Sequence, residues 1–356
     1  MRRIYLVRHG QPFFPGGEGY CLGSTDFPLS PLGRLQACLL GKAFEGKKIT
    51  VFSSPLTRAY ATACAIAPAP IVLDELREMH AGDWDGLSFR EIKQRWPELF
   101  EARAYDKALA IPGSEDWHEG QKRFLAGVKK AIISSEGDIV IVAHTTVILS
   151  LICHVMDSEE YKDFSYRQNC GAWYMLEEDS GSMRCIFPWE SPKPELDEAL
   201  CIKLLEAAKL PEHVISHCKA VANEALRLCD ELKMAGTVLD RELIYSSALL
   251  HDIARLEDKH PETGAVWLKE LGCKRQAEII RQHHDIESEN IDEAAVVYIA
   301  DKLIQESEKV SLRSRFEKSR EKCKSAEALA VHERRAKQAL GIAEKINSLC
   351  EKELIT

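Results

Sequence analysis

The chain has 356 residues, 45% of them hydrophobic, enough to fill the cores of two or three domains, so a largely disordered protein is excluded. The 56 acidic residues outnumber the 47 basic ones, and the excess is shared by both sides of residue 190, so neither half has the positive field that nucleic-acid binding requires. The 12 cysteines form no CxxC pair, which predicts reduced thiols in a cytoplasmic protein.

The apolar segments predict neither a signal peptide nor a membrane span. The first apolar run, residues 4–7, ends at Arg8 and is too short for a signal-peptide core. The stretch 139–156 has no Lys, Arg, Asp or Glu, but it contains His144 and His154, so we expect a buried strand followed by a helix. The predicted protein is soluble and cytoplasmic, with no membrane and no nucleic acid among its partners.

The first half of the chain alternates strand-like and helical patterns, which is typical of an α/β domain. The pairs Ser30-Pro31 and Ser54-Pro55 predict helix starts, because Ser can cap free N–H groups and Pro fits the first helical position. The expected strands cover residues 3–7, 50–53 and 138–143.

Three prolines at positions 188, 192 and 194 interrupt the pattern, because neither a helix interior nor a central strand accepts them. We place a Pro-rich linker at 188–194, between an α/β domain at 1–187 and an all-α domain at 195–306, with a helical tail at 307–356. Beyond the linker, helical periodicity predicts segments near 195–208, 211–234, 240–256, 261–271, 274–285 and 292–306.

Arginines and histidines follow the predicted strands of the first domain. Arg8 and His9 follow the first strand, Arg58 lies one turn into the helix after the second, and His144 ends the third. Because ligands bind at the carboxyl ends of strands in open α/β sheets, we expect these side chains to meet. Guanidinium groups can hold phosphate oxygens and a neutral imidazole can attack phosphorus, so the set predicts phosphoryl chemistry.

The motifs around these residues resemble those of the histidine phosphatase superfamily. They are Leu6-Val7-Arg8-His9-Gly10, Asp26-Phe27-Pro28-Leu29-Ser30, Ser53-Ser54-Pro55-Leu56-Thr57-Arg58-Ala59, Leu76-Arg77-Glu78-Met79 with Gly82-Asp83-Trp84-Asp85-Gly86, and Val142-Ala143-His144.

The resemblance implies a three-layer α/β fold that needs no cofactor, and it implies a role for each residue. His9 would become the phosphohistidine, and Glu78 would donate a proton to the leaving oxygen. The residues that would bind the phosphoryl group are Arg8, Arg58 and His144, with Gln11 and Thr25 as candidates for the pocket wall.

Two features depart from the family pattern. Thr145 and Thr146 follow His144 where relatives usually have glycines, which crowds the approach of the backbone to phosphate. Ser24 stands where many relatives have a basic residue, which removes a possible substrate contact.

Within the superfamily, the chain is more similar to phosphatases than to mutases. The segment between Glu78 and His144 is short beside that of phosphoglycerate mutases, and residues 20–26 resemble the α-ribazole phosphatase branch. A phosphosugar or phosphoglycerate mutase is the alternative.

Histidines and aspartates recur on successive helices of the second domain. Asp301 follows an apolar helical run, as His251 does, and an ionised carboxylate buried there is costly unless a cation compensates it. A mixed imidazole and carboxylate set suits Mn, Fe, Zn, Mg, Co or Ni, without distinguishing among them. The set comprises His217, His251, Asp252, His260, His283, His284 and Asp301.

This part of the chain resembles the HD-domain phosphohydrolases, in particular those that hydrolyse dinucleotide phosphates. The resemblance implies that His217, His251, Asp252 and Asp301 bind one metal ion. A second ion would be bound by His260 and one or both of His283 and His284, and a metal-activated water would attack phosphorus. The matching motifs are Ala248-Leu249-Leu250-His251-Asp252-Ile253-Ala254, His260-Pro261 and Tyr298-Ile299-Ala300-Asp301-Lys302.

The tail from Glu306 onward is rich in Lys, Arg and Glu and has an amphipathic helical pattern. It either packs back on the HD helices or pairs two copies of the chain as a homodimer. Arg313 and Arg315 either reach a substrate phosphate or belong to a solvated charge run.

Together these features predict a bifunctional phosphohydrolase that acts on small phosphorylated metabolites or nucleotides. Its first domain would use covalent catalysis without metal and its second a metal-activated water. One alternative is a phosphatase regulated by an HD domain that binds a nucleotide without hydrolysing it, and the other is the mutase.

Overall fold

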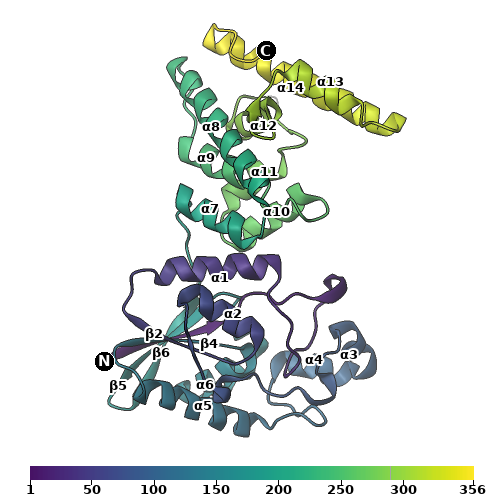
Figure 1. Cartoon of the computed structure of the whole chain (residues 1–356). Coiled ribbons are helices and arrows are strands. Elements are labelled where there is room, and N and C mark those ends of the chain that lie inside the picture. The colour runs from purple at the N-terminus through teal and green to yellow at the C-terminus, as the bar shows by residue number, and fades with distance from the viewer. Residues whose placement is uncertain (289) are drawn as a thin grey trace. The chain divides into compact units, whose positions relative to one another are not determined.

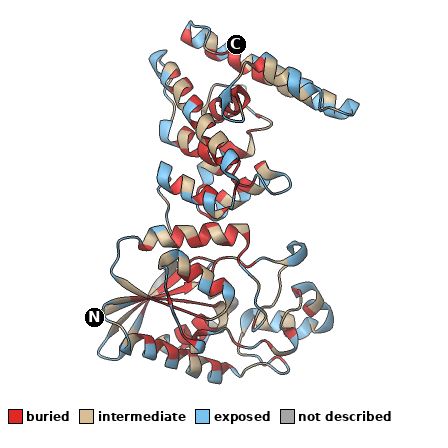
Figure 2. Ribbon diagram, viewed as in Figure 1, coloured by how far each residue is buried: buried red, intermediate tan, exposed pale blue. Residues whose placement is uncertain are grey.

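The computed structural model describes residues 1–288 and 290–356, and the chain divides into two units, Met1–Lys193 and Pro194–Thr356 (Figure 1). Each unit encloses its own buried residues (Figure 2). The predicted linker starts at residue 188, whereas the last strand of the first unit, β6 (Ser182–Glu190), continues to Glu190. This strand lies at the edge of its sheet, where a proline is tolerated because one side of the strand needs no ladder hydrogen bond.

Unit 1 is built around a six-stranded sheet with the order β3-β2-β4-β1-β5-β6. The first four strands in the chain are parallel, and the last two are antiparallel additions at one side of the sheet. All three predicted strands are present as β1, β2 and β4. The strands of this sheet are β1 (Arg2–Arg8), β2 (Ile49–Ser53), β3 (Ile71–Val72), β4 (Asp138–Ala143), β5 (Trp173–Asp179) and β6.

Helices cover both faces of this sheet, which makes unit 1 a three-layer α/β domain, as predicted (Figure 1). Alternate residues of β1 enter different cores because successive side chains of a strand point to opposite faces. Ile4 and Leu6 pack with α5 (Trp117–Ile133) and α6 (Thr145–Met156). Tyr5 and Val7 pack with the helices of the other face, α1 (Pro31–Phe44) and α2 (Thr57–Ile66).

One of the two predicted helix starts is confirmed. The Ser30 hydroxyl accepts a hydrogen bond from the N–H of Gly33, and Pro31 is the first residue of α1. The prediction at Ser54-Pro55 is wrong, because α2 begins only at Thr57 and has no side-chain cap. The Ser54 hydroxyl lies 2.8 Å from Nε2 of His144, so this serine belongs to the site described below.

The segment between β3 and α5 forms a small layer of its own. It contains α3 (Phe89–Arg95) and α4 (Pro97–Tyr105), which pack around Trp84, Ile92 and Ile111. The short 3-10 helices of unit 1 are Pro15–Gly17, Asp74–Leu76, Gly82–Trp84, Glu159–Lys162 and Phe164–Tyr166.

Unit 2 is helical, as predicted, apart from one short hairpin. The central helix is α12, in which every residue after the first is buried. In the described part of the chain, no helix combines the length and the apolar character needed to cross a bilayer. The helices before the tail are α7 (Glu198–Ala207), α8 (Glu212–Met234), α9 (Arg241–Leu250), α10 (His260–Glu270), α11 (Lys274–Arg281) and α12 (Glu293–Leu303).

The tail consists of a short hairpin and two helices, whereas the sequence predicts a single amphipathic helix. It starts with the hairpin β7 (Ile304–Gln305) and β8 (Glu308–Lys309) and continues as α13 (Leu312–Arg320) and α14 (Ala326–Cys350). The second half of α14 packs on α8 and α12 within the same chain. The side chains buried on this face of α14 are Ala339, Ile342, Ala343, Ile346 and Cys350.

Candidate functional site

The strand ends of unit 1 bring the predicted phosphate-binding residues together. Parallel pairing places Arg8 beside Ala143, and the N–H of His9 donates to the carbonyl of Ala143 over 3.1 Å. His144 follows immediately and is the N-terminal cap residue of α6. The ring centroids of His9 and His144 are 5.0 Å apart, so residues more than 130 positions apart in the sequence share one site.

The His9 imidazole is held in the protonation state of a nucleophile. Its Nδ1 lies 2.7 Å from the carbonyl oxygen of Gly10, and a carbonyl oxygen can only accept, so Nδ1 carries the proton. The Nε2 lone pair is therefore free to accept from Nε of Arg58, 3.3 Å away. Burial, together with the charges of Arg58 and Arg8, holds the pKa of His9 well below its usual range, so the ring is neutral.

Arg58 is fixed by the loop that follows Cys21. Its side chain is 1% exposed, and Nη1 donates to the carbonyl of Thr25 over 2.9 Å and contacts Asp26 Oδ1 at 3.3 Å. Its Nη2 reaches the carbonyl of Gly23 at 3.3 Å. These contacts orient the guanidinium group while Nε remains directed at His9.

Two buried polar atoms at this site have no partner among the described residues. One is Nδ1 of His144, whose Nε2 contacts Ser54, and the other is Nε of Arg8, whose Nη1 donates to the carbonyl of Gln168 over 2.8 Å. Unpaired buried donors and acceptors are costly in a folded protein. A phosphoryl oxygen would satisfy the arginine donor, and it would satisfy the imidazole once that nitrogen carries a proton.

Glu78 caps the N-terminus of α6 beside this pair of histidines. Its carboxylate accepts from the N–H groups of Met79, Thr146 and Val147 over 2.9 to 3.1 Å. Burial nevertheless raises the pKa of Glu78, and the hydrogen bonds and Arg58 only partly offset it. Thr146 stands where relatives usually have glycine, and its backbone N–H still donates a hydrogen bond to the Glu78 carboxyl group.

Thr25 and Gln11, predicted as residues of the pocket wall, contact other protein groups around the site. Thr25 contacts Arg58 through its main-chain oxygen, and the amide oxygen of Gln11 accepts from the Ser30 hydroxyl over 3.1 Å. Both therefore support the loops around the site through these contacts.

Asp85 and Lys107 had no assigned role in the sequence analysis but lie in the surroundings of the site. The Asp85 carboxylate accepts from the N–H groups of Gly23, Ser24 and Thr25, which fixes the loop that orients Arg58. The Gly82–Gly86 motif was the available signal for this residue. Burial and then Arg103 lower the pKa of Lys107 to about 8, and Glu78 contributes in the opposite direction.

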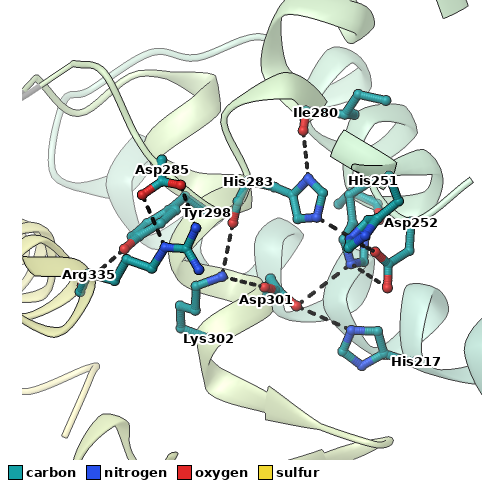
Figure 3. Close-up of polar contacts among 12 residues, drawn as sticks. His217, His251, Asp252, Ile280, His283, Asp285, Tyr298, Asp301, Lys302 and Arg335 are labelled. Carbon is teal, nitrogen blue, oxygen red and sulfur yellow. Dashed lines mark hydrogen bonds and ion pairs between the residues drawn. The ribbon is translucent and has the colours of Figure 1, made fainter. Parts of the chain in front are cut away.

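The predicted metal ligands of unit 2 come from α8, α10 and α12 and from the segments that follow α9 and α11. Figure 3 shows five of them close together, namely His217, His251, Asp252, His283 and Asp301. Two groups of potential ligands each have their donor atoms within 4.8 Å of one another. The imidazole rings form a continuous row with centroid distances of 4.8 to 5.4 Å between successive rings. The first group is His217, His251 and Asp252, and the second is His260, His283 and His284.

Three of these histidines are held in the tautomer that metal binding needs. Nδ1 of His217, His251 and His283 lies 2.6 to 2.8 Å from the carbonyl oxygens of Glu306, Ala248 and Ile280, respectively. The proton on Nδ1 leaves Nε2 of each neutral ring with a lone pair for a metal ion. In the metal-free chain, burial lowers the pKa of His217 but the hydrogen bond to Asp301 outweighs it and raises that pKa, so its Nε2 can share a proton with Asp301 instead. Metal-bound histidines in proteins are usually oriented in this way by a carbonyl or carboxylate behind the ring.

The two aspartates face these lone pairs. Asp301 Oδ1 lies 3.2 Å from Nε2 of His217 and 3.7 Å from Nε2 of His251, and Asp252 Oδ2 lies 3.7 Å from the same nitrogen of His251 (Figure 3). Lone pairs and carboxylate oxygens repel each other unless a cation or proton lies between them. Asp252 Oδ1 lies 3.1 Å from Nε2 of His260 and 3.6 Å from Nε2 of His283, and within the described chain the latter nitrogen is buried without a hydrogen bond. This donor set fits a divalent metal ion.

Lys302 is a member of this site whose role the sequence did not indicate. Its Nζ donates to Asp301 Oδ2 over 2.6 Å and to the carbonyl of His283 over 2.9 Å. Burial alone would raise the pKa of Asp301, but Lys302 and His217 hold it well below its usual range. Lys302 thus keeps Asp301 ionised and ties it to the segment after α11.

His283 and His284, which the sequence could not distinguish, differ in their surroundings. His283 is 1% exposed and is anchored through Nδ1, whereas His284 is half-buried and its ring lies 4.8 Å from that of His260. Burial, followed by the neighbouring His283, lowers the pKa of His284 to about 2. Both belong to the second group of potential ligands.

Comparisons with known proteins cover both units. Residues 4–187 match the histidine phosphatase superfamily (branch 1), and residues 214–305 match the HD domain. Glucosyl-3-phosphoglycerate phosphatase of Mycolicibacterium vanbaalenii is 31% identical over 164 residues, 42% of this chain and 72% of the relative. Phosphoserine phosphatase 1 of Hydrogenobacter thermophilus is 29% identical over 175 residues, 47% of this chain and 82% of the relative.

Among solved structures, the alpha-ribazole phosphatase from Shigella flexneri is 26% identical and has a TM-score of 0.45, with 52% of this chain and 94% of that chain covered. The family match extends over more than half of the 356 residues. The chain therefore belongs to the histidine phosphatase superfamily and is a phosphoric ester hydrolase that carries an HD domain in its second unit.

Proposed function

We propose that unit 1 hydrolyses phosphomonoesters through a phosphohistidine and that unit 2 hydrolyses phosphoesters of nucleotides or dinucleotides with the help of a divalent metal ion. The chain would then act on small phosphorylated molecules at two chemically different centres. The observation that carries the first half is the Nε2 lone pair of buried His9 beside Arg58. The second half rests on the Nε2 lone pairs that face Asp252 and Asp301.

In the proposed phosphatase reaction, Nε2 of His9 attacks phosphorus and the P–O bond to the leaving group breaks. Arg8, Arg58 and His144 bind the phosphoryl oxygens and the charge that develops on them. Glu78 gives its proton to the leaving oxygen and, as a carboxylate, takes a proton from the water that then attacks the phosphohistidine. The P–N bond breaks, inorganic phosphate is released, and His9 returns to its neutral form.

The surroundings of Glu78 favour a substrate with an additional negative charge on the leaving group. Besides burial, the charge of Arg103 lowers the pKa of Lys107 and the charge of Glu78 raises it, so these two basic residues lie near the proposed proton donor. The two phosphatases described above as relatives are named for phosphoserine and glucosyl-3-phosphoglycerate, both of which carry a carboxylate besides the phosphate. We infer a phosphomonoester of a small acidic metabolite.

In unit 2, His217, His251, Asp252 and Asp301 would hold one metal ion, and His260 with His283 or His284 would hold a second. When bound, such ions supply activation of water and charge stabilisation on phosphorus. The carbonyl groups behind His217, His251 and His283 keep the Nε2 atoms aimed at the centre. Lys302 keeps Asp301 ionised and in place.

One experiment on the full chain tests both halves of the proposal. Quenching with dodecyl sulfate at alkaline pH during turnover of p-nitrophenyl [32P]phosphate is expected to leave acid-labile label on the peptide that contains His9, with and without a chelator. Hydrolysis of bis(p-nitrophenyl) phosphate is expected to stop after chelation and to return when Mn²⁺ is added. Absence of the label contradicts the first half, and diester hydrolysis that survives chelation contradicts the second. With a labelled phosphomonoester that carries a second hydroxyl group, such as 3-phosphoglycerate, transfer of label between the two hydroxyl groups instead of to water would indicate a mutase.

We expect phosphatase activity toward alkyl phosphomonoesters to fall on the alkaline side of the raised pKa of Glu78, and we expect no fall from protonation of His9 near pH 6.5. The raised pKa of Glu78 means that its proton is lost as the pH rises through that value, which removes the donor. The depressed pKa of His9 means that the nucleophile stays neutral through the usual titration range of histidine, about pH 6.5. The measurement is kcat/KM against pH for the wild type and Glu78→Gln.

For Glu78→Gln, the alkaline limb should disappear and the rate should fall by about 10²- to 10⁴-fold with an alkyl phosphate. The loss should be smaller with p-nitrophenyl phosphate, because its leaving group needs no proton. An unchanged alkaline limb in this variant would exclude Glu78 as the proton donor.

A further inference from the structure

The two helices of the tail, α13 and α14, form part of the wall of a large cavity in unit 2. The cavity has a volume of about 1370 Å³ and includes His217, Asp252 and Asp301 of the candidate metal centre in its lining. The tail lies outside both family matches, which end at residues 187 and 305. Its contribution to the cavity is therefore a property of this chain and not of the matched HD region. The cationic, aromatic and apolar side chains that the tail contributes to the lining include Arg315, Phe316, Lys318, Lys322, Val331 and His332.

The α13 side of the cavity carries three cations. Arg315, Lys318 and Lys322 are spaced three and four residues apart, which places them on one side of α13 and the turn that follows it. Over residues 1–288 and 290–356, no ion pair joins any of the three to an acidic group. Arg335, which also lines the cavity, is instead paired with Asp285. The three cations are thus available to an anionic ligand.

None of the acidic residues that line the cavity belongs to α13. Apart from the two aspartates of the metal centre, they are Glu306 and Glu308 of the hairpin and Glu327 at the start of α14. The three cations without an ion pair therefore lie on α13 and the turn after it, and the two aspartates lie at the HD centre, where Arg255 and Lys302 also line the cavity. A chain of phosphates associated with a divalent ion would be complementary to both.

An aromatic pair lies beside the cations. The rings of Phe316 and His332 are 5.5 Å apart at 78°, and both line the cavity. The Ser319 hydroxyl lies 2.8 Å from Nε2 of His332 and fixes the orientation of that ring. Val331, which is 39% exposed, adds apolar surface to the same wall. Half-buried rings of this kind provide stacking surfaces for a nucleobase.

We propose that the tail binds a nucleoside polyphosphate, with its phosphates against Arg315, Lys318 and Lys322 and its base against Phe316 and His332. This rests on the function proposed above for unit 2 and deepens it, because it names the substrate class and assigns its recognition to the tail. Arg313, the other arginine considered in the sequence analysis, is exposed and is not part of the cavity lining, so it has no role in this site.

The test is calorimetric binding of two probes to the full chain loaded with Mn²⁺. One probe is adenosine 5′-(β,γ-imido)triphosphate, which resists hydrolysis between its last two phosphates, and the other is inorganic tripolyphosphate, which lacks a base. The charge variant is the triple change Arg315→Gln, Lys318→Gln and Lys322→Gln. The matched control removes three exposed cations of the tail that do not line the cavity, Arg313→Gln, Lys324→Gln and Lys337→Gln.

The charge variant should bind both probes about tenfold or more weakly, whereas the control triple should match the wild type. Phe316→Leu should weaken the nucleotide by about fivefold or more and leave tripolyphosphate unchanged. His332→Gln should behave in the same way, so the base site is tested even if one of these variants does not fold.

Equal binding by the charge variant and the control triple would overturn the proposal. A nucleotide that binds wild type no more tightly than tripolyphosphate would overturn it as well, because no base would then be recognised. If the wild type binds neither probe but hydrolyses bis(p-nitrophenyl) phosphate with Mn²⁺, only the tail proposal fails. If that hydrolysis is also absent, the proposed function of unit 2 fails with it.

Discussion

Replacement of His9 by Ala is expected to abolish phosphomonoester hydrolysis by the full chain, with a loss of about 10⁴-fold or more in kcat. The variant removes the only atom positioned as a nucleophile in the proposed reaction, Nε2, which accepts from Nε of Arg58. Arg8, Arg58 and His144 would still bind phosphate, so KM should change far less than kcat. The measurement is steady-state turnover of p-nitrophenyl phosphate together with phosphoenzyme labelling after an alkaline denaturing quench.

The control for this experiment is His118→Ala, which removes an exposed histidine of α5 and should leave the kinetics unchanged. Metal-dependent diester hydrolysis by the His9→Ala protein should also persist, which shows that the variant is folded. Retention of phosphoenzyme labelling after His9→Ala would assign the covalent intermediate to another residue. Retention of monoester turnover without labelling would place the phosphatase activity elsewhere in the chain.

Much of the fold of unit 1 could be predicted because its central strands are short, apolar and followed by polar motifs. β1, β2 and β4 have this pattern, and their parallel pairing brings Arg8, His9 and His144 to one edge. β3 and the antiparallel pair β5 and β6 were not predicted. β3 has only two residues, and β5 and β6 carry charged residues such as Glu177 and Arg184 that mask the strand pattern.

The contacts that support the proposed catalytic residues could not be predicted from the sequence. Ser54 was interpreted as a helix cap, yet α2 begins only at Thr57 and the Ser54 hydroxyl contacts His144. Asp85 acts through the backbone of residues 23–25, which are 60 to 62 positions away, and no local pattern predicts such a contact. Sequence motifs identify the groups that do chemistry more readily than those that hold them.

The same distinction holds for the HD domain. The order of histidines and aspartates predicted the potential ligands, but not which carbonyl would fix each tautomer. Ile280 and Ala248 supply those carbonyls from the ends of their own helices, three residues before the histidines that they anchor. The tail was predicted as one helix because its hairpin is short and polar, so its two strands give no apolar signal.

Replacement of Asp301 by Asn is expected to affect both metal binding and folding of unit 2. An amide lacks the negative charge of the carboxylate, so metal affinity should fall by more than about 100-fold. The change also leaves Nζ of Lys302 without its anionic partner, although the lysine side chain is only 10% exposed. Breaking one side of a buried ion pair typically costs about 3–5 kcal/mol, so the metal-free protein should unfold at lower denaturant concentration.

The stability that Asp301 contributes to the metal-free protein is expected to decrease as the pH falls. Because the folded-state pKa of Asp301 lies below its unfolded value, its contribution to stability is present above about pH 4 and is lost as the pH falls. The stability difference between the wild type and Asp301→Asn should therefore shrink on acidification. The measurement is urea unfolding of the metal-free full chain at several pH values, followed by a metal titration at neutral pH.

Asp252→Asn provides the internal comparison, because Asp252 is an equally buried ligand candidate without a buried lysine partner. Its nearest permanent cation, Nη1 of Arg255, is 3.8 Å away on a side chain that is 48% exposed. This variant should lose metal as Asp301→Asn does, but with a smaller loss of metal-free stability. Asp230→Asn, which breaks an exposed pair with Arg241, should change neither property. Equal destabilisation by Asp252→Asn and Asp301→Asn would contradict the role given to Lys302, and unchanged metal affinity in both would remove the two aspartates from the metal site.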